Sequence, residues 1–309
     1  MKLGHISDLH VLELDRPRPW QFLNKRVVGG TNLLLNRSKS HSTDVVKAAL
    51  GQIDALGVDH IAISGDLTNL ALDSEFAAAA EIVATINDAS RRVSVVPGNH
   101  DYYTRGAARA RRFETYFAPY LRSDLPDYQL ASGYPFCKLL GEDVALVGLN
   151  SGIATPLLFA TGQVDVEELR RAQALLDDPL VRERFKVVMI HHPVMPVNYK
   201  RVEFSRRLIN ADDVLRVVRR GDVDLVIHGH THHFATLQLP KLRSHGSTFV
   251  CEAGCTSVAH HRDPHMAGKF NIYHIADRRL QKIETHLFES HEAGFRPWRE
   301  QVFEQTVNA

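Results

Sequence analysis

Apolar and polar positions alternate along the chain in segments typical of β-strands and amphipathic helices. Short apolar runs predict buried strands at residues 3–7, 60–64, 93–96, 186–190 and 224–227. A helical period predicts helices at residues 43–56, 74–87, 106–117, 166–177 and 205–220. Because strands and helices alternate in this order, the pattern indicates sheets with parallel strands and helices on their faces.

Two regions carry shorter strand patterns with tighter turns. In the middle of the chain, strands are predicted at residues 128–130, 136–140 and 144–149, with a hairpin turn at 141–143. Towards the C-terminus, strands are predicted at about residues 236–239, 247–251, 270–275 and 280–288. We find no repeat and no linker rich in Gly, Pro or Ser, so one domain over 1–309 is expected. Its predicted class is α/β, with two mixed β-sheets packed face to face and helices outside.

Composition limits the class of protein. The 309 residues include 44% hydrophobic and 24% charged residues, which is typical of a soluble globular chain. A formal net charge of +1 argues against a long nucleic-acid track. The first residues show no signal-peptide pattern, and no run approaches the ~18 apolar residues of a membrane span. We therefore expect a cytoplasmic protein, and a nucleic-acid partner is disfavoured.

The three cysteines are too few and too irregular for a disulfide framework. They are Cys137, Cys251 and Cys255. Cys251 and Cys255 lack the second pair of thiols that a zinc site of this kind needs. We interpret them as small buried residues near the end of a strand.

Candidate metal ligands follow five of the predicted strands. The fragments are Asp8-Leu9-His10, Gly65-Asp66-Leu67-Thr68-Asn69, Gly98-Asn99-His100-Asp101, His191-His192-Pro193 and His228-Gly229-His230. The carboxyl ends of strands in an open α/β sheet face a common crevice, so the fragments are expected to converge. Each fragment alone is compatible with an ordinary turn. Five compatible fragments together favour a metal site, and oxygen and imidazole donors without thiolate match Mn, Fe, Zn or Co.

These fragments resemble the successive motifs of the calcineurin-like metallophosphoesterases. The matching motifs are "DLH", "GDLTN", "GNHD", "HHP" and "GHTH", and they follow one another in this order from Asp8 onwards. The resemblance implies a four-layer αββα sandwich with two divalent metal ions at one edge. It implies that Asp66 bridges a first metal, bound by Asp8, His10 and His230, and a second metal, bound by Asn99, His191 and His228.

The resemblance also implies roles for residues beside the ligands. His100 is expected next to the leaving-group oxygen, where it stabilises or protonates that oxygen. Asp101 either orients a histidine of the site or caps the loop, and local evidence leaves both interpretations open. His192 either supports the ligands or faces the substrate, and Asn69 is a further candidate for substrate binding.

Eighteen histidines are an unusually large number for this length. Histidine is the commonest metal ligand and a proton carrier near neutral pH. Histidines that are not among the candidate ligands cluster at and after the last motif: His232, His233, His245, His260, His261 and His265. We expect most of them at the surface or packed around the ligands.

The predicted activity is hydrolysis of a small-molecule phosphodiester by a hydroxide that bridges two metals and attacks phosphorus in line. Residues 67–71 lack the arginine that protein Ser/Thr phosphatases carry after this motif. The motif set is closer to class III cyclic-nucleotide phosphodiesterases and glycerophosphodiester hydrolases. Alternatives are a phosphomonoesterase, a lipid-linked pyrophosphate hydrolase, a nuclease and an inactive scaffold. The inactive scaffold is disfavoured because all seven predicted ligands are present.

An insertion at about residues 13–41 separates the first motif from the first helix. Cationic residues and bulky apolar residues alternate in it in blocks. This composition is compatible with an amphipathic element that touches a lipid substrate or an anionic membrane. A lid over the site or a homo-oligomer contact is the favoured interpretation.

Overall fold

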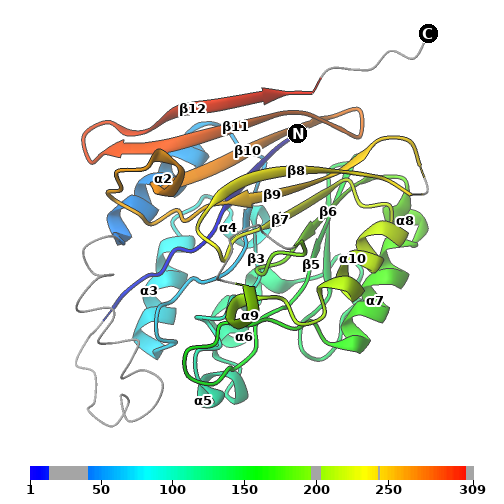
Figure 1. The fold of residues 1–309 in the computed structure, drawn as a ribbon, viewed down its shortest axis with the longest axis horizontal. Coiled ribbons are helices and arrows are strands. Elements are labelled where there is room, and N and C mark those ends of the chain that lie inside the picture. Colours follow the sequence, from blue (N-terminus) through cyan, green and yellow to red (C-terminus); the bar gives the residue numbers. More distant parts are fainter. Residues whose placement is uncertain (14–40, 196–202, 243, 304–309) are drawn as a thin grey trace.

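Two six-stranded β-sheets form the centre of the molecule in a computed structural model that describes residues 1–13, 41–195, 203–242 and 244–303 (Figure 1). Most of the insertion predicted at 13–41 lies outside these residues. Its interpretation as a lid, an oligomer contact or a lipid contact therefore stays a prediction.

The first sheet joins the N-terminal strand to the last strands of the chain. Its order is β12 (Gly294–Val302), β11 (Arg279–Ser290), β10 (Lys269–Ala276), β1 (Lys2–Ile6), β2 (His60–Ile63) and β3 (Val93–Val95). Strands β1, β2 and β3 are parallel, whereas β1 is antiparallel to β10. The parallel part consequently presents three strand ends on one edge.

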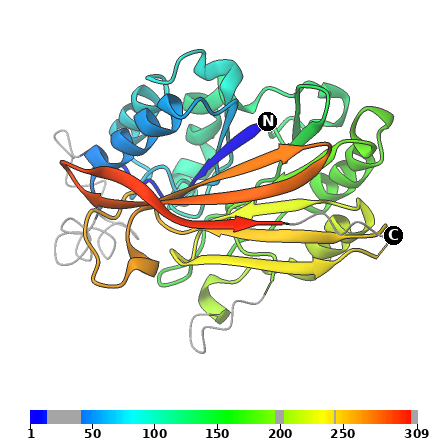
Figure 2. The same cartoon turned by 90° about the horizontal axis from the view of Figure 1, so that it is seen from above.

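The second sheet is built from the middle of the chain. Its order is β4 (Phe136–Leu140), β5 (Val144–Gly148), β6 (Phe185–Met189), β7 (Leu225–His228), β9 (Ser247–Ala253) and β8 (Phe234–Pro240). Strands β5, β6, β7 and β9 are parallel, and antiparallel strands close both edges. The antiparallel strands β8 and β9 lie beside β10 to β12 of the first sheet (Figure 2).

Helices cover the outer face of each sheet. The α-helices are α2 (Thr43–Ala55), α3 (Asp73–Val83), α4 (Ala89–Arg92), α5 (Arg105–Arg109), α6 (Arg112–Phe117), α7 (Val166–Leu176), α8 (Pro179–Arg182), α9 (Glu203–Arg206) and α10 (Ala211–Arg220). Short 3-10 helices in the described ranges are η3 (Ala118–Leu121), η4 (Pro126–Tyr128) and η5 (Pro264–Met266). Within the described ranges, no helix combines the length and the apolar character needed to cross a membrane.

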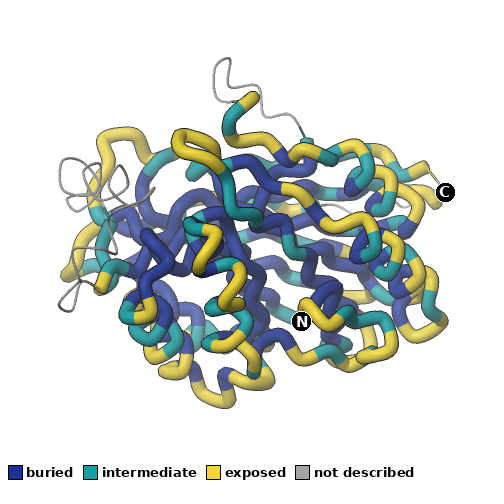
Figure 3. Tube along the Cα trace, turned by 90° about the horizontal axis from the view of Figure 1, so that it is seen from below, coloured by how far each residue is buried: buried dark blue, intermediate teal, exposed yellow. Residues whose placement is uncertain are grey.

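Alternation along β5 separates two hydrophobic clusters and defines the layers. Val144 and Leu146 belong to the larger cluster, which contains side chains of both sheets and of α2 and α3. Ala145 and Val147 face the opposite way and pack against α7 and α10. Figure 3 shows this buried interior as continuous dark blue segments. The predicted four-layer αββα sandwich of two mixed sheets is therefore confirmed.

Three predicted elements differ from the structure. Residues 128–130 are not a strand: Tyr128 ends the 3-10 helix η4, and residues 129–130 lie in the loop that follows it. The helix predicted at 106–117 is divided into α5 and α6 by Arg111, whose φ is 49°. The helix predicted at 205–220 is likewise divided into α9 and α10.

Strand β12 has no counterpart in the sequence prediction. It forms the edge of the first sheet, and Phe295 is its one fully buried residue. Exposed polar side chains and Pro297 interrupt the apolar alternation that would identify a strand. Proline is tolerated here because an edge strand has backbone groups without a ladder partner.

His60 begins β2 and is buried away from the strand ends that carry the motifs. Its Nε2 lies 2.9 Å from Oγ of Ser94. Burial, and to a lesser extent the cations of Lys138 and Arg92, lower the pKa of His60 to about 3. The unfolded chain therefore binds more protons than the folded chain between about pH 6.5 and 3, and this site loses stability as the pH falls.

Replacing His60 by Gln is expected to weaken the acid sensitivity of the metal-free protein. Between pH 6.5 and 5 the variant should lose about 1–2 kcal/mol less unfolding free energy than the wild type, since one pKa unit equals ~1.4 kcal/mol. Urea unfolding at both pH values measures this difference. His261→Gln at an exposed position is the control, and equal slopes for His60→Gln and the wild type would contradict the prediction.

Candidate metal centre

The loops that follow β1, β2, β3, β6 and β7 meet at one edge of the sandwich. Backbone hydrogen bonds connect them. The amide of Asp8 donates to the carbonyl of Gly65 at 3.0 Å, and the amide of His10 donates to that of Asp66 at 2.9 Å. In the second sheet, the amide of Gly229 donates to the carbonyl of His191 at 3.1 Å. The convergence expected from the strand order is therefore observed.

Four predicted ligands have a left-handed backbone. The φ angles are 56° at Asp8, 45° at His10, 52° at Asp66 and 78° at His230. A positive φ at a residue other than glycine costs about 1–3 kcal/mol and occurs mainly where the surroundings enforce it. Four of the positive-φ residues thus lie in the loops that follow the motif strands, where the left-handed backbone sets the direction of each side chain.

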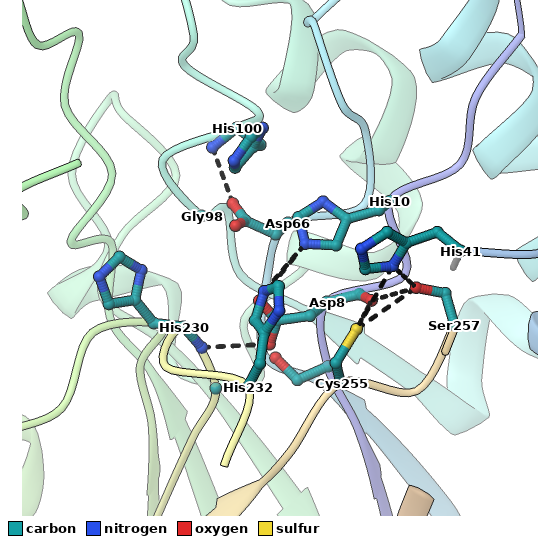
Figure 4. Close-up of polar contacts among 12 residues, drawn as sticks. Asp8, His10, His41, Asp66, Gly98, His100, His230, His232, Cys255 and Ser257 are labelled. Atoms are coloured by element: carbon teal, nitrogen blue, oxygen red, sulfur yellow. Dashed lines mark hydrogen bonds and ion pairs between the residues drawn. The ribbon is translucent and has the colours of Figure 1, made fainter. Parts of the chain in front are cut away.

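One group of ligand atoms contains Asp8, His10 and His232. Oδ1 of Asp8 lies 3.8 Å from Nε2 of His10. Nε2 of His232 lies 3.1 Å from each of these two atoms. All three side chains converge in Figure 4. This group combines one carboxylate and two imidazoles, a donor set typical of first-row transition metals.

A second group contains Asp66, His191 and His230. Nε2 of His191 lies 3.4 Å from Oδ2 of Asp66 and 3.3 Å from Nδ1 of His230. Ligand atoms of Asp66 also lie within 4.8 Å of ligand atoms of His10 and His100. Asp66 thus lies within 4.8 Å of ligand atoms on both sides of the site, which is the position that a bridging carboxylate requires.

His230 differs from the position that the resemblance implies. We expected its ring beside Asp8, but the ring lies with the second group and its Nε2 is 2.8 Å from the carbonyl oxygen of Arg206. Its backbone amide donates to Oδ2 of Asp8 at 3.1 Å. Because that amide and the positive φ fix the backbone, the ring is turned away from Asp8 (Figure 4).

Asn99 and His228 are the remaining predicted ligands. Both are buried. Oδ1 of Asn99 accepts no hydrogen bond from the described residues. Nδ1 of His228 lies 3.1 Å from the carbonyl oxygen of Gly229, and among the described residues His228 belongs to neither group of ligand atoms. Asn99 therefore has a buried oxygen without a hydrogen-bond partner among the described residues, and the ligand roles of Asn99 and His228 both stay predictions.

Buried polar atoms without partners show that the residues fit metal ions. Within the described part of the chain, Oδ1 of Asp8, Nδ1 of His10 and Oδ1 of Asn99 are buried without a hydrogen bond. Leaving such atoms unpaired costs about 1–3 kcal/mol each. Cations at this edge would satisfy the two carboxyl and amide oxygens, so the donor set fits two divalent metals.

The electrostatic state of the site also suits metal binding. Burial alone would lower the pKa of His191, but the Asp66 carboxylate outweighs it and raises that pKa to about 9. Burial lowers the pKa of His10 and brings that of His230 to about 3, and neighbouring histidines add to both effects. The rings of His10 and His230 are consequently neutral, which is the form that binds metal, whereas His191 has to release a proton when a metal binds.

His100 is fixed by the second motif. Its Nδ1 donates to the carbonyl oxygen of Asn69 at 2.6 Å, and its backbone amide donates to Oδ1 of Asp66 at 2.7 Å. Its ring stacks on Tyr103 with centroids 5.3 Å apart. Asn69, predicted to bind substrate, is itself buried and donates from Nδ2 to the carbonyl oxygen of His10. These contacts make Asn69 a residue that positions His10 and His100.

The contacts of Asp101 match the loop-capping interpretation. Its Oδ2 accepts from the amides of Gly98 at 2.9 Å and Leu67 at 3.2 Å. Its Oδ1 accepts from the amide and the hydroxyl of Thr68, both at 3.0 Å. Burial and the nearby Asp66 carboxylate raise the pKa of Asp101 to about 7. Asp101 thus ties the second and third motif loops together.

His192 packs against the predicted ligand His230. It is fully buried, with Nδ1 2.8 Å from Oγ of Ser151 and Nε2 3.2 Å from the carbonyl oxygen of Ala160. Its ring lies 4.3 Å from that of His230. With both ring nitrogens engaged by the protein, the supporting role is favoured over contact with a substrate.

Sequence reasoning did not single out two histidines of the site. His232 belonged to a set expected mostly at the surface or around the ligands, and His41 lay at the end of the insertion. The ring of His41 lies 4.9 Å from that of His10, and its Nδ1 is 2.8 Å from Oγ of Ser257 (Figure 4). The run His230-Thr231-His232 could have indicated His232, because alternate residues of a turn can face one site.

The family described as calcineurin-like phosphoesterase matches this chain over residues 1–234. The match extends through the last motif of the site. The chain belongs to this family. A curated relative, the UDP-2,3-diacylglucosamine hydrolase of Cellvibrio japonicus, is 26% identical over 155 residues. That segment spans 50% of this chain and 58% of the relative, so the match covers little more than half of the relative's length.

Solved structures share the fold at low sequence identity. A dimetal phosphatase from Danio rerio is similar with a TM-score of 0.59 and 15% identity, covering 92% of this phosphoesterase and 94% of that chain. The purple acid phosphatase PPD1 of yellow lupin is similar with a TM-score of 0.60 and 10% identity, covering 97% of this chain and 52% of the other. These similarities support the αββα architecture.

Replacing Gly98 by Ala is expected to disturb the shared carboxylate. A Cβ at this position would overlap Oδ1 and the backbone nitrogen of Asp66. Titration calorimetry with Mn²⁺ should show an affinity at least about tenfold weaker, the scale of change when a ligand is misoriented. Gly106→Ala in α5 is the control, since its Cβ would meet nothing nearer than Oγ1 of Thr104 at 3.9 Å. Unchanged affinity in Gly98→Ala would refute the close packing.

Proposed function

We propose that this phosphoesterase hydrolyses a phosphodiester bond of a small molecule with two bound divalent metal ions. The observation that carries the proposal is the position of Asp66, whose carboxylate lies within reach of ligand atoms on both sides of the site. Two divalent metals would supply an acidified water and neutralise charge on the phosphoryl oxygens. Mn, Fe, Zn and Co all suit the oxygen and nitrogen donors.

His100 is the proposed proton donor to the leaving oxygen. One of its ring nitrogens lies within 4.8 Å of ligand atoms of His10 and Asp66, so the ring borders the metal-binding groups without being needed as a ligand. Nδ1 donates to the carbonyl oxygen of Asn69, and this bond sets the plane of the ring. Any proton that His100 delivers to a substrate therefore leaves from Nε2.

A lipid-linked pyrophosphate is the second candidate substrate. It is favoured by the curated relative, a UDP-2,3-diacylglucosamine hydrolase, and by exposed apolar side chains near the site. Leu157, Leu158 and Phe204 are 48%, 77% and 68% exposed. The segments that carry them contact the site through the carbonyls of Ala160 and Arg206, which lie 3.2 Å from His192 and 2.8 Å from His230.

The Mn²⁺-loaded wild type is expected to hydrolyse bis(p-nitrophenyl) phosphate. Asp66→Asn and His191→Ala should each lower kcat by at least about 100-fold, because each removes charge or a donor that orients the reacting groups. Release of p-nitrophenol measures the rate, and His261→Ala at an exposed position is the control. Full activity in the two site variants, or no activity in the metal-loaded wild type, would reject the proposal.

Leu158→Ser tests the second candidate. If the exposed apolar side chains bind an acyl chain, the variant should raise the KM for UDP-2,3-diacylglucosamine at least about tenfold, since a buried leucine side chain contributes about 1.5–3 kcal/mol. Hydrolysis of the soluble diester should be unchanged. Leu242→Ser, at a leucine that is 69% exposed outside these segments, is the matched control. If Leu158→Ser and Leu242→Ser had the same KM for UDP-2,3-diacylglucosamine, the result would argue for a soluble substrate.

A further inference from the structure

We propose that this phosphoesterase docks on an anionic lipid bilayer through two segments beside the metal centre, residues 155–162 and 204–209. Ten large apolar side chains are exposed among the described residues, and five of them lie in these two segments. The proposal goes beyond the hydrolytic function, because it does not depend on which phosphate bond is cleaved. We refer to the five side chains as the apolar patch: Leu157, Leu158, Phe159, Phe204 and Ile209.

Backbone and ring contacts join the two segments into one surface. The amide of Ala160 donates to the carbonyl oxygen of Ser205 at 2.7 Å. The rings of Phe159 and Phe204 lie with their centroids 6.4 Å apart. Phe204 belongs to the short helix α9, which is labelled in Figure 1. The apolar patch is therefore continuous, although its members are about 45 positions apart in the sequence.

The two most exposed members of the patch are side chains that the monomer does not bury. Leu158 is 77% exposed and Phe204 is 68% exposed. Leu158 has a φ of 67°, in a turn where the amide of Phe159 donates to the carbonyl oxygen of Pro156 at 3.2 Å. Such turns usually carry glycine or short polar residues, which tolerate this backbone and contact with water. Contiguous exposed apolar side chains at such a position mark an interaction surface.

The charge of the two segments is positive. Their sequence contains Arg206 and Arg207, both exposed, and no Asp or Glu. The guanidinium carbon of Arg207 lies 4.6 Å from the centroid of the Phe204 ring, so the positive charge is next to the apolar surface. Anionic headgroups attract cationic side chains, while apolar side chains enter the boundary between headgroups and acyl chains. The surface therefore complements an anionic bilayer in both charge and polarity.

A bilayer suits this surface better than a second protein chain does. Stable protein interfaces usually take about 20–30 residues from each partner, which is more than the two segments contain. In a symmetric dimer through the patch, Arg206 and Arg207 would lie close to the same arginines of the other copy, and like charges in an interface are unfavourable. A bilayer needs only a few apolar side chains beside positive charge.

Docking through the patch would place the metal centre next to the lipid headgroups. The carbonyl oxygen of Ala160 lies 3.2 Å from Nε2 of His192. The carbonyl oxygen of Arg206 lies 2.8 Å from Nε2 of His230. Both segments thus contact histidines at the edge of the sandwich where the motif loops meet. A substrate held in the same bilayer would need to move only a short distance to reach them.

Co-sedimentation of the full chain with vesicles tests the proposal. The wild type should bind vesicles of phosphatidylcholine with about a quarter phosphatidylglycerol. The double variant Leu158→Ser/Phe204→Ser should bind them at least about tenfold more weakly, because two large apolar side chains no longer enter the bilayer. Leu180→Ser/Leu242→Ser is the matched control, since both leucines are exposed outside the two segments.

The charge is tested separately with Arg207. Arg207→Gln should weaken binding to the anionic vesicles about fivefold and should reduce its dependence on salt, whereas Arg207→Lys should retain both. Equal affinity of the wild type for these vesicles and for pure phosphatidylcholine would overturn the assignment to an anionic surface.

Fluorescence of the variant Phe204→Trp reports insertion directly. Its difference spectrum against the wild type should shift to shorter wavelength when the anionic vesicles are added, because the indole leaves water. An unshifted spectrum would contradict insertion of the patch. Circular dichroism and thermal melting check the folding of each variant.

Several results would overturn the proposal. These are a wild type that does not bind the vesicles, and a double variant that binds them as the wild type does. Self-association that requires Leu158 and Phe204, without vesicle binding, would assign the patch to a contact between copies of the chain. Vesicle binding by a metal-loaded protein that hydrolyses no phosphodiester would refute the proposed function and leave this inference standing.

Discussion

The carboxylate of Asp66 is the point on which the arrangement of the site depends. It lies at the end of β2, between a sheet that supplies Asp8, His10 and Asn99 and a sheet that supplies the later histidines. Its left-handed backbone, the amide of His100 on Oδ1 and His191 beside Oδ2 hold it between the two groups. Two sheets packed face to face therefore share a single anionic group at their common edge.

The fold could be predicted largely from local patterns because each buried strand has a continuous apolar run. The sequence pattern predicts strands β1, β2, β3, β6 and β7 to within one residue at every end. The elements that the sequence pattern did not predict depend on information that is absent from the local pattern. Strand β12 is an exposed edge whose burial depends on neighbours far along the chain, and the break at Arg111 depends on a left-handed residue that sequence periodicity does not encode.

The candidate site was predictable in its chemistry and less so in its geometry. The motif spacing identified which strand ends converge, but it does not determine the direction of a side chain. His230 and His232 lie on the same turn, and only the backbone angles and the contact with Arg206 separate their directions. The contacts of Asp101 were likewise not predictable, since its partners include backbone amides that no residue pattern reveals. His41 approaches from a segment 31 positions after His10, beyond any local signal.

The glycines beside the ligands have a consequence for how such an enzyme can diversify. A Cβ at Gly229 would overlap Oγ of Ser7 and Oδ2 of Asp8, just as one at Gly98 would overlap Asp66. Neither glycine position therefore has space for a larger side chain, whether it arises by natural selection or by protein engineering. A change of substrate specificity is instead expected from substitutions in surrounding segments such as 157–159 and 204–209, which already carry exposed side chains.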